Sequence, residues 1–134
     1  MEIVNHLESL RQKFPECETA AFGDISTGLI LTVRSEHKQP QERLDRLCLT
    51  AQELLDGRTA ALAAPALSLG GDPLQVALSI TGDKIELFLR SPEVPTDALC
   101  FVCARDVDID ALIASASAGL RDIGKDQASS GPGR

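Results

Sequence analysis

The chain contains no tryptophan and no tyrosine, and phenylalanine occurs only four times. So few aromatic rings leave little with which to stack the bases of a single-stranded nucleic acid. The net charge of −7 likewise lacks the basic excess with which proteins contact phosphates. We therefore expect no nucleic-acid partner, and we expect a hydrophobic core made of Leu, Ile, Val and Ala.

Long hydrophobic runs are also absent. No stretch approaches the roughly 20 apolar residues that a transmembrane helix requires. The first five residues include Glu2 and carry no basic cluster before an apolar run, unlike a secretory signal. These features predict a cytoplasmic protein without membrane contact. The acidic charge favours solubility, and the alternative explanation is a basic surface on a partner protein.

Motifs for metal, cofactor or catalytic chemistry are scarce. Cys100 and Cys103 form a single Cys-x-x-Cys pair, but alternation along a strand places their side chains on opposite faces. We expect all four cysteines (the other two are Cys17 and Cys48) to be reduced and unligated. No phosphate-binding loop or nucleophile elbow is present. The sequence therefore predicts no cofactor, no metal and no enzymatic activity.

Two weaker signals have simple structural explanations. Asp106, Asp108 and Asp110 begin like a calcium loop, but the Gly and Glu that an EF-hand requires further on are missing. Acidic residues at a helix N-terminus explain the run, with Asp108 as the N-cap. His6 and His37 have no neighbour at metal-ligand spacing, so we expect both on the solvated surface.

Hydrophobic periodicity predicts eight elements in one domain. The expected helices span 2–14, 39–56 and 109–123, and the expected strands span 19–24, 29–34, 76–81, 84–90 and 98–104. This order, α-β-β-α-β-β-β-α, predicts an α/β domain of the α+β type, with three layers around a five-stranded antiparallel sheet. Residues 1–123 form the domain, and the polar residues 124–134 are expected to be a disordered tail. The Ala-rich connection from Arg58 to Pro73 has no clear periodicity.

The hairpin around Gly82-Asp83 has the most specific local signal. Glycine at the first central position suits a two-residue turn, and such a turn fixes the register of the two strands. Ile80 should then face Ile85, with two further apolar pairs, Leu78 with Leu87 and Val76 with Leu89, on the same side of the sheet.

Three local patterns resemble the roadblock/dynein-light-chain family. They are the leading helix that ends before Pro15, the hairpin Phe22-Gly-Asp-Ile-Ser-Thr-Gly-Leu-Ile-Leu31, and the strand Leu99-Cys-Phe-Val-Cys103 before a last helix. The resemblance covers about Val4 to Ile123 and implies a profilin-like roadblock fold. It also implies a homodimer that acts as an adaptor or regulator of a small Ras-like GTPase, or as a scaffold subunit.

The resemblance further implies which elements pair: the third strand with its copy, and the second helix with its copy. The sequence supports this choice because Leu74–Thr81 carries no charge and no proline within the strand, and such an edge is open to pairing. The expected interface residues are Leu44, Leu47, Cys48, Ala51, Leu54, Leu55, Val76, Ala77, Leu78, Ser79 and Ile80. The alternative function is a small-ligand sensor of the PAS type, which would require a sizeable pocket lined by polar groups.

Overall fold

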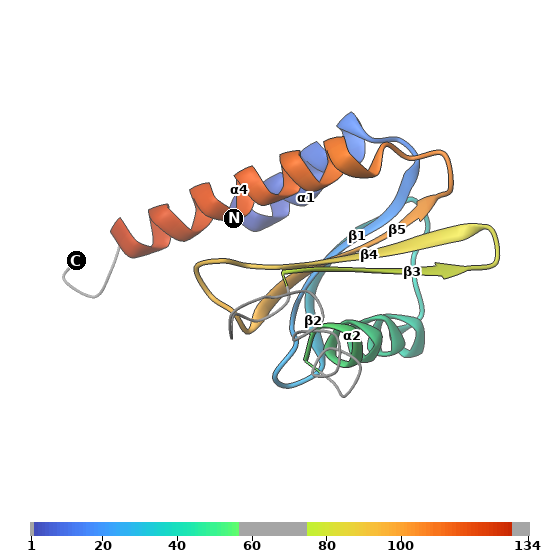
Figure 1. Cartoon of the computed structure of the whole chain (residues 1–134), viewed down its shortest axis with the longest axis horizontal. Helices are drawn as coiled ribbons and strands as arrows, with labels where there is room; N and C mark the ends of the chain where they lie inside the picture. Colours follow the sequence, from blue (N-terminus) through green and yellow to red (C-terminus); the bar gives the residue numbers. More distant parts are fainter. Residues whose placement is uncertain (1, 57–74, 130–134) are drawn as a thin grey trace, which may run out of the picture.

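A computed structural model of the chain describes residues 2–56 and 75–129. The elements follow the order α1 (Glu2–Lys13), β1 (Cys17–Asp24), β2 (Leu29–Ser35), α2 (Gln41–Asp56), β3 (Val76–Thr81), β4 (Lys84–Arg90), β5 (Asp97–Ala104) and α4 (Ile109–Ser129). The five strands form one antiparallel sheet in the order β2-β1-β5-β4-β3. Helices α1 and α4 lie side by side on one face of the sheet, and α2 covers the other (Figure 1). The predicted fold class is confirmed.

Two hydrophobic cores fill the spaces between the layers. Strand β5 contributes to both because its side chains alternate: Leu99, Phe101 and Cys103 face α1 and α4, whereas Cys100 faces α2. All four side chains are fully buried. A strand that is apolar on both sides belongs in the middle of a sheet, as the sequence predicted. Cys100 and Cys103 do lie on opposite faces.

The two hairpins have the expected turn chemistry. Ile80 pairs with Ile85, and the register continues without a shift from Val76 to Thr81, so the predicted register is confirmed. Gly82 has a φ of 59° and Gly28 a φ of 75°, values that favour glycine. In the first turn the Asp24 carboxylate accepts hydrogen bonds from the Ser26 amide (2.9 Å) and hydroxyl (2.5 Å).

Three expectations require correction. Helix α4 continues through Gly124 to Ser129 instead of ending at Ile123, because a glycine inside a helix costs only about 1 kcal/mol. The supposed tail is thus partly helical, and residues 130–134 lie outside the described residues. His6 is not a solvated side chain: it is half-buried and bonds the Ala116 carbonyl of α4 (3.2 Å). A Cβ at Gly119 would lie 1.9 Å from its ring, so this contact depends on glycine.

The smaller expectations fare as follows. Helix α2 begins at Gln41, and the Pro40 carbonyl accepts bonds from the first turn. His37 is exposed, as predicted. The connection from Arg58 to Pro73 lies outside the described residues.

Arg90 joins α2 to the sheet. Its side chain, only 3% exposed, donates hydrogen bonds to the Leu55 carbonyl (2.9 Å) and the Asp56 carboxylate (2.5 Å) at the C-terminus of α2. It also donates to the Pro95 carbonyl in the loop before β5 (2.8 Å). A guanidinium carries five N–H groups in a planar fork, so it can satisfy several acceptors at once. A cation at a helix C-terminus also interacts favourably with the helix dipole.

We expect Arg90→Met to lower the free energy of unfolding by about 3 kcal/mol, because the carbonyls of Leu55 and Pro95 and the Asp56 carboxylate lose their donor. Denaturant unfolding followed by circular dichroism measures the loss. Arg46→Met is the matched control: Arg46 pairs with Glu42 in the same helix, but both side chains are exposed. That change should alter stability by less than about 0.5 kcal/mol. Equal losses in the two variants would contradict a special role for Arg90.

Candidate interaction surface

Strand β3 forms an open edge of the sheet. In the described residues it pairs with β4 alone and carries no charged side chain. The amide of Arg90 donates to the Gln75 carbonyl (2.8 Å). Backbone N–H and C=O groups point to alternate sides along a strand, so those of Gln75, Ala77 and Ser79 point toward β4. The backbone groups of Val76, Leu78 and Ile80 therefore point away from β4, toward the open side. No strand among the described residues lies beside these groups, so this edge is suited to pairing with another strand.

The opposite edge of the sheet, β2, is protected. Thr32 pairs with Phe22 and Ile30 pairs with Gly23, so Leu31 is the extra residue of a bulge. Arg34 adds a charge to the same strand and lies 3.6 Å from Glu8 of α1. A bulge and a charged side chain both discourage edge pairing. The two edges thus differ, and β3 is the one suited to pairing.

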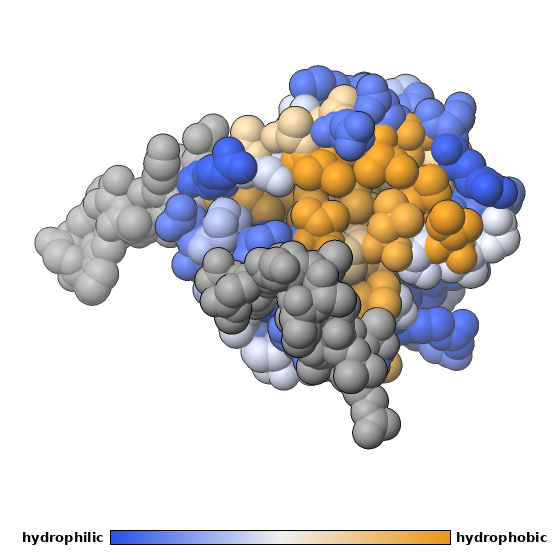
Figure 2. All heavy atoms as spheres, viewed as in Figure 1, coloured by the Kyte–Doolittle hydropathy of each residue, from blue (hydrophilic) through white to orange (hydrophobic). Residues whose placement is uncertain are grey.

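The side chains of β3 divide between the two faces of the sheet. Ala77 and Ser79 are half-buried on the α2 side, where Ala77 packs against the core. Val76, Leu78 and Ile80 project on the α1/α4 side and are 40%, 41% and 61% exposed. Figure 2 shows apolar residues gathered over β3 and toward α4, with hydrophilic residues around them.

Most of the α2 residues predicted for the interface are buried within this chain. Five of them are buried against the sheet of the same chain: Leu44, Leu47, Cys48, Ala51 and Leu55. Leu54 is half-buried and packs against the same core, and the exposed leucine of the helix is Leu49, at 55%. The sheet of the same chain covers most of the apolar residues of α2. Pairing of α2 between copies would therefore use its exposed residues, which are polar apart from Leu49.

A cleft of about 290 Å³ opens between the N-terminal half of α2 and the sheet. Its floor is apolar, and its charged lining residues come from separate segments: Glu18, Arg43, Arg46, Lys84 and Glu86. Lys84 pairs with Glu18 at 3.0 Å. Glu86 is half-buried, and burial raises the pKa of its carboxyl. The sequence did not single out these residues, because only the folded sheet brings them together.

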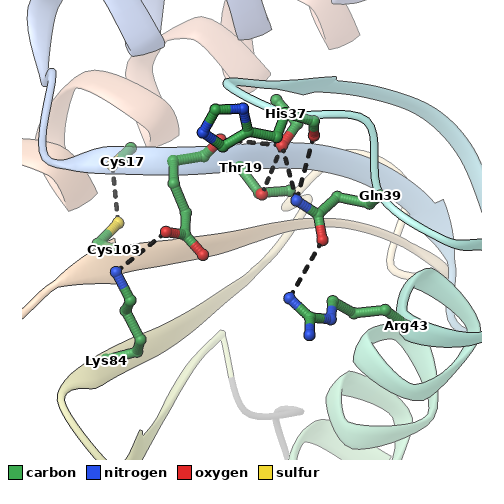
Figure 3. A network of polar contacts seen from close by, with 9 residues as sticks. Cys17, Thr19, His37, Gln39, Arg43, Lys84 and Cys103 are labelled. Carbon is green, nitrogen blue, oxygen red and sulfur yellow. Dashed lines mark hydrogen bonds and ion pairs between the residues drawn. The ribbon is translucent and has the colours of Figure 1, made fainter.

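A polar network borders this cleft and holds the N-terminus of α2 (Figure 3). The Gln39 amide donates to the Ser35 hydroxyl (3.2 Å) and to the His37 carbonyl (3.1 Å). Arg43 of α2 donates to the Gln39 side chain (3.5 Å), and Ser35 bonds Thr19 of β1 (2.9 Å). The network is structural, since its groups are occupied with one another.

The described part of the chain contains no cluster of three metal-ligating side chains and no helix long and apolar enough to span a membrane. Asp108, from the aspartate run, accepts a bond from the Ala111 amide (3.1 Å). It thus caps α4, as predicted.

The four cysteines are buried free thiols. Cys17 and Cys103 belong to the core under α1 and α4, and Cys100 belongs to the core under α2. The sulfur atoms of Cys17 and Cys103 lie 2.7 Å apart across β1 and β5. The hydrogen bond to Cys17, followed by burial, raises the pKa of the Cys103 thiol. Burial raises the pKa of Cys48 and Cys100 as well. Since the thiolate is the reactive form, these environments suppress thiol chemistry.

We expect none of the thiols to react quickly with Ellman's reagent in the native protein, and all four to react after denaturation in guanidinium chloride. Absorbance of the released chromophore gives the number. Rapid labelling of the native protein would contradict the burial of the thiols. Only two reactive thiols in the denatured protein would show one disulfide, and the close sulfur atoms of Cys17 and Cys103 make them the expected pair.

We expect Glu86→Gln to stabilise the protein at neutral pH. Because burial raises its pKa, the Glu86 carboxyl binds a proton more tightly in the folded chain than in the unfolded chain, where its pKa has the ordinary value of 4.5. Stability is therefore lost as the pH rises above 4.5, and no loss remains below it. The variant should gain about 1–3 °C in melting temperature near pH 7 and nothing at acidic pH. Glu93→Gln, in an exposed loop, is the control and should not shift the melting temperature.

No protein-family model matches the sequence, and no curated protein matches it significantly. Solved structures do match the fold. A roadblock/LC7 domain from Streptomyces avermitilis aligns with a TM-score of 0.68 at 18% identity, over 88% of this chain and 91% of that chain. Myxococcus xanthus MglB gives 0.70 at 12% identity, over 95% and 98%. A structure described as MglB with tetrameric arrangement gives 0.67 at 16% identity, over 91% and 85%. The chain therefore has the roadblock/LC7 fold that its sequence predicted.

Proposed function

We propose that the protein is a non-enzymatic adaptor that forms a homodimer by antiparallel pairing of β3 with β3 of a second copy. The observation that carries this proposal is the unprotected β3 edge. Its outward backbone groups, at Val76, Leu78 and Ile80, have no strand beside them in the described residues. Pairing would satisfy these groups and join the two sheets into one.

The α2 side of β3 is shaped for a close approach of two copies. Ala77 and Ser79 are small and uncharged, so they leave space beside α2. Arg43 and Arg46 line the cleft beside this strand, so a dimer would bring the clefts near each other. The contact between the two α2 helices would then involve exposed residues such as Arg46, Leu49 and Glu53 instead of the buried leucines.

The proposed role is regulation of a small Ras-like GTPase, or service as a scaffold subunit. The resemblance in sequence to the roadblock/dynein-light-chain family supports it, and so does the shared fold. One of the similar solved structures is described as a tetrameric arrangement, so assembly of copies occurs on this fold. Fold alone does not specify the partner.

The second candidate is a small-ligand sensor of the PAS type. The cleft between α2 and the sheet favours it, because Glu86, Lys84 and Arg43 place both signs of charge around an apolar floor. Its volume of about 290 Å³ lies at the lower end of ligand sites. Several of its lining residues are exposed, so it is a surface cleft and not an internal pocket. The β3 edge therefore favours the adaptor.

We expect light scattering after size-exclusion chromatography to give a mass of about twice 14.3 kDa for the wild type at micromolar concentration. Leu78→Pro should give a monomer, because proline removes an outward N–H donor and leaves the bonds between β3 and β4 intact. Leu78→Thr is the matched control: it keeps the donor and suits a strand, so it should remain dimeric.

A monomeric wild type would overturn the proposed dimer. A Leu78→Pro variant that stays folded by circular dichroism and dimeric would place the interface elsewhere. Leu31→Lys, on the opposite edge, should have no effect on the mass, because β2 takes no part in the pairing.

A further inference from the structure

The α1/α4 side of β3 carries an apolar surface that edge pairing does not use. We call Val76, Leu78 and Ile80 the apolar β3 face; all three are exposed large hydrophobic side chains. Their pairing partners on β4 are buried, so the layer of α1 and α4 covers β4 and stops before β3. Ile109 and Ile113 of α4 are half-buried and pack against this core. Apolar residues extend from β3 toward α4 in Figure 2.

Pairing of β3 with a second copy leaves this face open. Strand pairing occurs within the plane of the sheet, whereas side chains stand perpendicular to it. In the proposed dimer the two apolar β3 faces would lie next to each other, which enlarges the exposed apolar surface. Large contiguous patches of this kind mark binding sites.

One end of the face is acidic. Asp83 lies in the turn that follows β3 and is exposed. Ala104 at the end of β5 pairs with Lys84, so the loop that follows β5 emerges at the same end of the sheet. That loop and the first turn of α4 bring three further exposed aspartates, 106, 108 and 110, against the single cation Arg105. A ligand for this surface should combine apolar and basic side chains.

The backbone chemistry of the face favours a helix as the ligand. The face of a sheet offers side chains but no backbone donors or acceptors, because those lie in the sheet plane. An extended peptide would leave its own N–H and C=O groups without protein partners there, whereas a helix satisfies them internally. Helices dock on such surfaces through apolar residues at i, i+3, i+4 and i+7.

We propose that the apolar β3 face binds an amphipathic helix of a partner protein, with lysine or arginine beside its apolar stripe. The face is available in the monomer and in the dimer, so this proposal stands independently of pairing through β3. It adds a second contact surface, on the opposite side of the sheet from α2.

Synthetic helical peptides labelled with fluorescein test the proposal by fluorescence anisotropy. The first peptide has leucines at i, i+3, i+4 and i+7 flanked by lysines. The second has glutamates in place of the lysines, and the third has the composition of the first with the leucines scattered around the helix. We expect saturable binding of the first peptide alone, with affinity that falls as salt is added.

Variants locate the site. Ile80→Glu should weaken binding of the first peptide about tenfold or more, because it puts a charge in the apolar face. Leu49→Glu is the matched control: Leu49 is similarly exposed, at 55% against 61% for Ile80, but lies on α2. It should leave binding unchanged. Asp83→Asn combined with Asp106→Asn should weaken binding about three- to tenfold, because two exposed charge interactions are lost.

The outcomes separate this proposal from the proposed dimer, because light scattering gives the mass of every variant used. Peptide binding by a monomeric wild type would overturn the dimer alone. A dimer that binds none of the peptides, or binds the lysine and glutamate peptides equally, would overturn the basic helix. A mass above that of the dimer, lost in Ile80→Glu and without peptide binding, would assign the face to a further copy of the chain.

Discussion

One buried arginine, Arg90, fixes the C-terminal end of α2 against the sheet. Arg90 ends β4 and reaches the last turn of α2 and the loop before β5, so a single side chain connects three separate segments. Burying its charge carries a high desolvation cost, which the hydrogen bonds to the carbonyls of Leu55 and Pro95 and to the Asp56 carboxylate offset. At the other end of the helix, Gln39 and Arg43 make weaker and more exposed contacts. The helix is therefore fixed firmly at its C-terminus, and the cleft lies at the end that is held less firmly.

Much of this fold follows from local signals. The register of the β3–β4 hairpin could be predicted because a two-residue turn leaves a single alignment of its strands. The central place of β5 could be predicted because apolar residues occupy both of its alternating sets. The start of α4 could be predicted because Asp108 is a suitable N-cap residue. Each of these properties depends on residues that are close together in the sequence.

Which side chains are covered by other elements of the fold could not be predicted in this way. An apolar stripe on a helix has the same sequence pattern whether it packs on its own sheet or on a second copy. The pattern alone therefore does not show that Leu47 and Ala51 are buried within the chain. Val76 and Leu89 have the same apolar character, yet only Leu89 lies under α1 and α4. The cleft combines Glu18, Lys84 and Arg43 from distant segments, and no motif connects them. His6 became half-buried because Gly119 provides space for its ring.

The strand order has a consequence for synthesis of the chain. Strand β5 lies between the two hairpins, so β1–β2 and β3–β4 cannot join until residues 97–104 have left the ribosome. Until then the sides of β1 and β4 that will receive β5 are open, and both strands carry core residues such as Ala20 and Phe88. Incomplete chains thus expose unpaired, apolar strand edges, which are prone to aggregate. The sheet is completed late and over long sequence separations, which slows folding and prolongs the exposure of these edges.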